Sequence, residues 1–199
     1  MTSPLHARDF TTLHTSIEEG DSLLRVVKTD RLYDFDINSY ARLAGSDFHN
    51  GVIEVEVCSR ILPDAPDLAR GFIGLAFHIA EDDSRFESFY LRPANGRDCT
   101  DPLRRQHGVQ YFCYPTYTFQ YFRDRQITCY ESPADIGLDE WIKLRLTVDN
   151  GCGTLSVNGA PLLKVEQMLL GPQARGGVGL FVDIGTEGLF RNLRITCTD

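Results

Sequence analysis

The sequence lacks the features that identify most membrane-spanning, secreted and nucleic-acid-binding proteins. No stretch approaches the ~18 consecutive apolar residues of a transmembrane helix, and the opening segment MTSPLHARDFTT has no apolar core of a signal peptide. Basic residues are few, with 20 Lys and Arg against 28 Asp and Glu and a formal net charge of -8. Because nucleic acids and anionic membranes attract basic surfaces, we expect neither as a partner. With no signal peptide in the opening segment, we expect a cytoplasmic location.

Metal-binding and redox spacings of cysteine are also missing. The sequence has 6 cysteines, but they form no C-x-x-C pair, and none lies at a zinc-site spacing from a histidine. We therefore expect reduced thiols, no metal ion and no cofactor. The sequence does not indicate an oligomeric state.

Short strand patterns dominate, and helical periodicity is scarce. Ile53, Val55 and Val57 alternate with Glu54 and Glu56, as expected for a strand with one buried face. Strand patterns cover residues 21–28, 37–45, 51–61, 70–80, 85–93, 109–115, 117–122, 140–150, 153–165, 176–185 and 188–197. Such a series of short strands predicts an all-β fold of two packed antiparallel sheets. We expect a single domain over residues 1–199, in which residues 1–20 could be a loosely attached extension.

The strand series resembles that of concanavalin A-like jelly rolls, the superfamily of laminin-G-like domains, legume lectins and laminarinase-type glucanases. The similarity lies in FHNGVIEVEV, RGFIGLAFHI, EWIKLRLTV, GTLSVNG and GGVGLFVDIGTEGLFRNLRI, within residues 48–196. Bacterial domains named 3-keto-disaccharide hydrolases, or of unknown function, are the most similar. The resemblance implies a jelly-roll sandwich with one concave sheet, on which relatives bind saccharides. It also implies a minor alternative, a structural calcium ion near Phe48 to Gly51 and Asp183.

One strand and the turn after it carry an unusual number of hydrogen-bonding side chains. The segment RFESFYLRPANGR, residues 85–97, contains three arginines together with a glutamate, a tyrosine and an asparagine. On an extended strand Arg85 and Glu87 share one face, and Tyr90 and Arg92 share the other. A neighbouring strand has small residues at Gly74 and Ala76 beside His78, which suits the floor of a groove. The predicted ligand-binding residues are His78, Arg85, Glu87, Tyr90, Arg92, Asn95, Arg97, Gln110 and Tyr111.

This mixture of residue types suits a carbohydrate or another polar small molecule. Planar polar groups can bind neighbouring hydroxyls in pairs, aromatic rings can stack on a sugar, and arginine binds carboxylate or phosphate through two parallel hydrogen bonds. We therefore predict a carbohydrate-binding-type domain. A purely structural or protein-interaction module is an alternative, in which the polar groups brace the sandwich.

A glycan-processing hydrolase or lyase is the other alternative, with Glu87, His78 and Tyr111 as candidate catalytic residues. EDDSRFE offers the carboxylates Glu81, Asp83 and Glu87, but the last gap is too long for the glucanase pattern. Alginate-lyase-type jelly rolls carry an Arg-x-Glu-x-Arg strand and a Gln-x-His strand. This sequence keeps Arg85, Glu87 and Gln110, but it lacks the second arginine and has Phe112 where the histidine belongs. Neither catalytic motif is complete.

Overall fold

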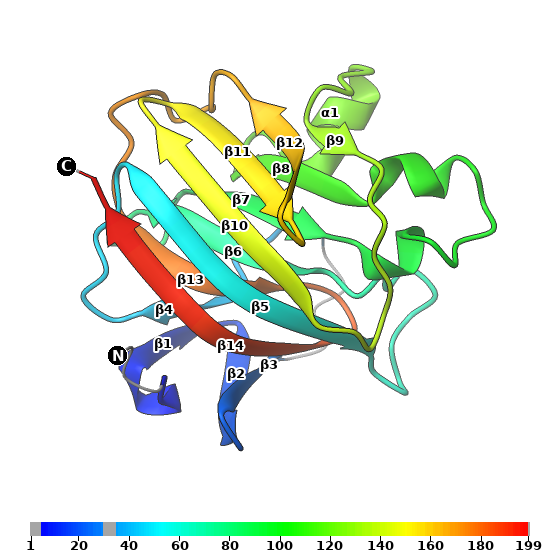
Figure 1. Ribbon diagram of the computed structural model, residues 1–199, viewed down its shortest axis with the longest axis horizontal. Helices are drawn as coiled ribbons and strands as arrows, with labels where there is room; N and C mark the ends of the chain where they lie inside the picture. The colour runs from blue at the N-terminus through cyan, green and yellow to red at the C-terminus, as the bar shows by residue number, and fades with distance from the viewer. Residues whose placement is uncertain (1–4, 30–34, 199) are drawn as a thin grey trace.

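The computed structural model describes residues 5–29 and 35–198, and it confirms the predicted all-β antiparallel sandwich (Figure 1). Sheet A has the strand order β1-β4-β13-β6-β7-β8-β9, and sheet B has the order β12-β11-β10-β5-β14-β3-β2. The elements are η1 (Ala7–Asp9), β1 (Phe10–Leu13), β2 (Thr15–Gly20), β3 (Leu23–Lys28), β4 (Tyr40–Leu43), β5 (Gly51–Ile61), β6 (Ile73–Ile79), β7 (Phe86–Leu91), η2 (Pro93–Asn95), η3 (Arg104–His107), β8 (Val109–Tyr114), α1 (Phe119–Asp124), β9 (Glu131–Ser132), β10 (Ile142–Asp149), β11 (Cys152–Val157), β12 (Ala160–Val165), β13 (Gly177–Val182) and β14 (Thr186–Cys197). Within the described ranges no helix is long and apolar enough to span a membrane.

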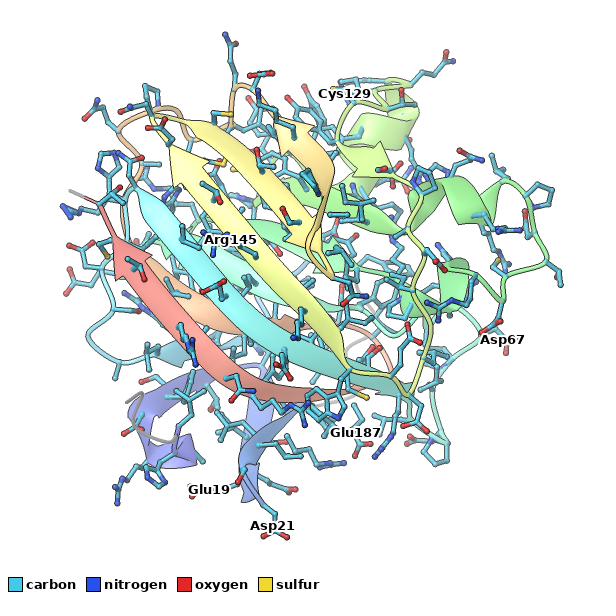
Figure 2. The ribbon with its side chains drawn as sticks, viewed as in Figure 1. Glu19, Asp21, Asp67, Cys129, Arg145 and Glu187 are labelled. Atoms are coloured by element: carbon cyan, nitrogen blue, oxygen red, sulfur yellow. The ribbon has the colours of Figure 1, made fainter. Side chains whose placement is uncertain are left out.

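Sheet B has one buried face and one face in water, which explains its clear sequence alternation. Buried and exposed residues alternate along the whole of β10, and the predicted hairpin between β11 and β12 turns at Asn158 and Gly159, both with positive φ. On the outer face Arg145 lies 2.6 Å from Glu54 across the β5–β10 pair. Arg145 is labelled on this face in Figure 2. Such exposed ion pairs contribute little to stability, so the face chiefly provides solubility.

The main core lies between the two sheets. Leu75, Phe77 and Phe89 of sheet A pack in one cluster with Val55 and Leu146 of sheet B, and all five are at most 2% exposed. Fully burying such a side chain contributes roughly 1.5–3 kcal/mol, so this layer provides most of the driving force for folding.

Sheet A is buried on both faces. Every residue of β6, β7 and β13 is buried. Its outer face carries a second cluster, which we call the outer aromatic layer and which consists of Tyr40, Phe72, Ala76, Ile79, Phe86, Tyr90, Phe112, Phe122, Phe181 and Ile184. Segments that follow β8, including α1, cover this layer. The concave face predicted as an open groove is therefore largely filled by the protein's own aromatic rings.

The small residue Gly74 makes room for this packing. A Cβ at Gly74 would lie 2.2 Å from the Phe89 carbonyl oxygen and 2.6 Å from Tyr90 Cα. The close approach of the neighbouring strand β7 therefore requires glycine here. The open space that Gly74 and Ala76 suggested in the sequence is taken up by β7 and the outer aromatic layer.

The strand predicted over residues 117–122 is wrong, because α1 covers residues 119–124. Thr118 has extended dihedral angles just before the helix, and the Phe119 backbone N–H donates to the carboxylate of Asp36 at 2.5 Å. That contact satisfies one of the amides that a helix start leaves free. Phe122 then packs into the outer aromatic layer.

Residues 10–20 lie at the edges of both sheets. β1 pairs with β4 in sheet A, and β2 pairs with β3 in sheet B. Only His14, with a φ of 48°, separates the two strands. Residues 10–20 thus add an edge strand to each sheet. Residues 1–4 of the predicted extension lie outside the described part of the chain.

Candidate functional site

A pocket of about 360 Å³ opens where β7 ends and η2, η3 and α1 converge. In Figure 1 the segment with η2 and η3 projects at the right of the molecule, and α1 lies above it. Asp67, labelled in Figure 2, marks the loop between β5 and β6, whose Leu68 and Arg70 also line the pocket. The lining residues are Phe35, Leu68, Arg70, Phe72, Tyr90, Arg92, Asn95, Asp101, Leu103, Arg104, His107, Phe119 and Arg123. We call this the arginine pocket.

Aromatic rings form one side of the arginine pocket. Phe35 meets Phe119 edge to face at 5.1 Å, and Phe72 meets Tyr90 at 6.1 Å. These contacts extend the outer aromatic layer to the mouth of the pocket. Ring contacts of this kind hold the aromatic faces in fixed orientations.

The rim of the pocket is apolar as well. Leu68 is 53% exposed and Leu103 is 72% exposed. In the described ranges, Leu138 is the only other large hydrophobic side chain that is exposed. Single exposed leucines are ordinary, but two that flank a pocket with aromatic walls indicate a contact surface for a ligand.

Arg92 forms the back wall and is almost completely buried. Its Nη1 donates to Glu131 Oε1 at 2.9 Å, and its Nη2 donates to the Tyr90 hydroxyl at 2.7 Å and to Gln110 Oε1. Burial by itself lowers the pKa of Arg92, but Tyr90 and Glu131 outweigh it and the pKa is raised. The guanidinium is therefore a fixed positive charge, held by its neighbours.

Arg70 is held less completely than Arg92. Its Nη1 donates to the backbone carbonyls of Asp67 at 2.6 Å and Ala69 at 2.7 Å. Burial and the positive charge of Arg104 lower the pKa of Arg70. Among the described residues no carboxylate lies within ion-pair distance of this guanidinium.

The arginine pocket contains three of the predicted ligand-binding residues. Tyr90, Arg92 and Asn95 line it, and Gln110 supports Arg92 from behind. Asn95 Nδ2 donates to the His107 carbonyl at 3.1 Å, while its buried Oδ1 has no partner. A ligand hydroxyl or a water molecule could satisfy that acceptor.

Two other predicted residues lie elsewhere. Arg85 is exposed and precedes β7. Arg97 is 41% exposed and pairs with Asp135 at 2.8 Å and Glu140 at 2.6 Å. Neither lines the arginine pocket: Arg85 lies at the opposite end of β7, and Arg97 is held at the surface by its two carboxylates.

The prediction that His78, Glu87 and Tyr111 face a ligand groove is not supported, because they meet between the two sheets. His78 Nδ1 lies 2.6 Å from Glu87 Oε2, and the Tyr111 hydroxyl donates to Glu87 Oε1. Glu87 and Tyr111 belong to the inner face by strand register, and Glu87 is 0% exposed. Strict alternation along β6 would place His78 on the same face as Gly74 and Ala76. It does not, because the pairing of β6 with β13 shifts near His78, which has a φ of 50°. A bulge of this kind turns its side chain to the other face.

The carboxylates that resembled the glucanase pattern do not meet in one site either. Asp83 accepts a hydrogen bond from the Tyr40 hydroxyl at 2.8 Å in a turn, whereas Glu87 lies inside the sandwich. The calcium alternative meets a similar difficulty. Asp183 Oδ1 binds Lys28 Nζ at 2.5 Å near Phe72, whereas Phe48 pairs with Gly176 near the other end of β6. Within the described ranges no group of three His, Cys, Asp or Glu could hold a metal ion.

Sequence reasoning missed most of the arginine pocket. Arg70, Arg104, Phe119 and Arg123 line the pocket but were not among the predicted ligand-binding residues. A signal for α1 was present, since Thr118 is a common helix-starting residue and Phe119 and Phe122 are three positions apart. No local pattern joins Arg70 to α1, because only the fold brings them together.

Comparison with known proteins identifies solved structures that share this fold. No family model matches the sequence, and no curated protein matches it either. Among solved structures, the carbohydrate-binding module CBM66 from Bacillus subtilis has a TM-score of 0.61 at 12% identity, and each chain is covered to 93%. A Bacillus subtilis protein of unknown function with a galectin-like fold has a TM-score of 0.58 at 14% identity, covering 95% of this chain and 89% of the other. A sialidase has a TM-score of 0.57 at 8% identity, covering 96% of this chain and 17% of its own. The chain therefore has the antiparallel jelly-roll sandwich fold that its strand series predicts.

Proposed function

We propose that the protein is a binding domain that recognises a saccharide in the arginine pocket. The observation that carries the proposal is the pocket itself, in which aromatic walls and arginine donors face the same space of about 360 Å³. A pyranose or furanose ring has apolar faces and a polar edge. Fixed aromatic rings can stack on those faces while Asn95 Oδ1, which has no partner, accepts a hydrogen bond from a hydroxyl.

Binding fits the pocket better than catalysis. Its acid–base groups are Asp101 and His107. Asp101 Oδ1 accepts hydrogen bonds from the backbone N–H groups of Leu103 at 2.9 Å and Arg104 at 3.2 Å. His107 Nδ1 lies 2.8 Å from Glu131 Oε2. Asp101 is held at the start of η3 and His107 Nδ1 is directed at the buried Glu131, whereas a hydrolase or lyase needs two such groups directed at the substrate.

The fold is consistent with this proposal and does not carry it. CBM66 is by its name a carbohydrate-binding module, and it covers nearly the whole of this chain. Identity of 12% leaves the ligand open, because one fold serves many functions. The pocket residues of this chain must therefore be tested directly.

The test compares Phe119→Leu with Tyr121→Leu in titrations against neutral and acidic oligosaccharides. Phe119 lines the pocket, whereas Tyr121 belongs to the same helix but does not. Loss of a stacking ring should weaken binding roughly 2- to 10-fold in Phe119→Leu. Tyr121→Leu should bind as the wild type does. Equal weakening in both variants, or no binding of any saccharide at millimolar concentration, would overturn the proposal.

A further inference from the structure

We propose that the saccharide carries an anionic group, a carboxylate or a sulfate ester, and that Arg70 and Arg104 bind that group. The inference deepens the proposed function and rests on it. It concerns a part of the pocket distinct from the aromatic wall.

The first argument is the sign of the charge in the pocket. Arg70, Arg92, Arg104 and Arg123 line it, and Asp101 is the only lining carboxylate among the described residues. The whole chain has a formal net charge of -8, so a cluster of positive charge runs against its composition. Such a cluster attracts an anionic ligand and raises its local concentration.

The second argument is that the positive charges are not equally compensated. Glu131, behind the wall, lies 2.9 Å from Arg92 Nη1 and 3.7 Å from Arg123 Nη2. The same carboxylate lies 2.8 Å from His107. Glu131 is thus shared by three groups of the inner pocket, whereas Arg70 has no carboxylate within ion-pair distance among the described residues and feels Asp67 only through space.

Arg70 has N–H donors that are not used within the protein. Only its Nη1 is engaged, by the two backbone carbonyls that fix its position, and these carbonyls bring no negative charge. The Nε and Nη2 groups form no hydrogen bond within the described part of the chain. Their planar arrangement matches the two oxygens of a carboxylate or a sulfate.

Arg104 is the second cation of this part of the pocket, and it is paired only at the surface. Its Nε lies 3.4 Å from Asp101 Oδ2, in an ion pair whose Arg104 side chain is 54% exposed, so the pair is weak and an anion can share the guanidinium. Asp101 is already bound through Oδ1 to the start of η3. The positive charge of Arg104 also lowers the pKa of Arg70, and this effect is second only to that of burial. An anion between the two guanidinium groups would relieve that repulsion.

The experiment uses two matched pairs of glycans that differ only in charge. Oligogalacturonate is compared with its methyl ester, and dextran sulfate is compared with dextran. Affinities are measured by titration at low and physiological salt for the wild type, Arg70→Gln, Arg104→Gln and Arg105→Gln. Arg105 is exposed, adjoins Arg104 and does not line the pocket, so its variant controls for overall charge.

We expect the charged member of one pair to bind at least about 10-fold more tightly than its neutral partner, since each charge-assisted contact contributes on this order. Arg70→Gln and Arg104→Gln should each remove most of that preference, and Arg105→Gln should keep it. The pair that shows the preference identifies carboxylate or sulfate.

Two results would overturn the inference, and they are distinguishable. Equal binding of charged and neutral glycans, or a preference that Arg105→Gln loses as fully as Arg70→Gln, refutes the anion site and leaves saccharide binding standing. Absence of binding by all four glycans refutes both proposals. Circular dichroism of each variant confirms that a loss of binding is not a loss of fold.

Discussion

Asp36 connects the loop before β4 to the wall of the arginine pocket. Its Oδ2 accepts a hydrogen bond from the Phe119 backbone N–H at 2.5 Å, and its own N–H donates to Asp183 Oδ2 at 3.1 Å. Its Oδ1 lies 3.5 Å from the Tyr90 hydroxyl, and the residue is 2% exposed. Burial, reinforced by the negative charge of Asp183, raises the pKa of Asp36 from 3.8 to about 7, against the opposing hydrogen bond from Phe119 and the charge of Arg92.

The raised pKa of Asp36 makes the free energy of unfolding depend on pH, and the direction follows from the protons that each state binds. An unfolded chain releases the Asp36 proton near pH 4, whereas the folded state keeps it until about pH 7. Between these values the folded state binds one proton more than the unfolded state. Stability from this group therefore falls as the pH rises, by about 1.4 kcal/mol per pH unit, and levels off above pH 7.

We expect Asp36→Asn to remove that loss, because an asparagine side chain does not titrate and its oxygen can still accept the Phe119 hydrogen bond. Urea unfolding of both proteins from pH 5 to pH 8 gives the free energy of unfolding at each pH. The difference, variant minus wild type, should grow by roughly 3 kcal/mol across this range.

Asp82→Asn is the control for Asp36→Asn. The hydrogen bonds from Ser84 lower the pKa of Asp82, so it is ionised in both states above pH 5 and its difference should stay flat. A flat or shrinking difference for Asp36→Asn would refute the assignment of Asp36 as a buried group that ionises near neutrality.

Two further substitutions test the packing that supports the pocket. Arg92→Met should lower the free energy of unfolding by about 3–5 kcal/mol, because it leaves Glu131 without its principal buried partner. Arg97→Met, which removes an exposed ion pair, should lower it by less than about 1 kcal/mol. Similar losses in the two variants would show that Arg92 does not brace the wall. Gly74→Ala should lower the free energy of unfolding by about 1–3 kcal/mol or more, because its Cβ would lie 2.2 Å from the backbone of β7. Gly20→Ala is the control, since its Cβ would meet the flexible Leu23 side chain at 3.1 Å. Thermal unfolding measures both variants, and an unchanged stability of Gly74→Ala would contradict the packing.

The strands with one face in water were the most predictable part of the fold. In β5 and β10 a buried residue alternates with a charged one, as at Val55 and Glu56, and this period is visible in the sequence. Sheet A offers no such signal, because its central strands are buried on both faces. The side to which a residue points then depends on register, and one bulge at His78 reversed the expected side of that residue.

The candidate site was only partly predictable for a related reason. Tyr90, Arg92 and Asn95 are close in sequence, and their cluster was recognised. Arg70 and Phe119 come from distant loops, and only the packing of those loops over the end of β7 makes them neighbours. A composition that is polar and aromatic thus indicated a ligand site, but the walls of that site required tertiary structure.

The position of β14 has a consequence for how the chain can acquire its structure during synthesis. β14 lies between β5 and β3 in sheet B, shown in red beside the cyan β5 in Figure 1, although it is the last of the described strands in chain order. While the ribosome is still adding residues, β3 and β5 each present an unpaired edge. The β2–β3 hairpin cannot join the sheet until β14 emerges from the exit tunnel. Nascent chains arrested before Thr186 should therefore remain dependent on chaperones, whereas chains released after Cys197 can close both edges in one step.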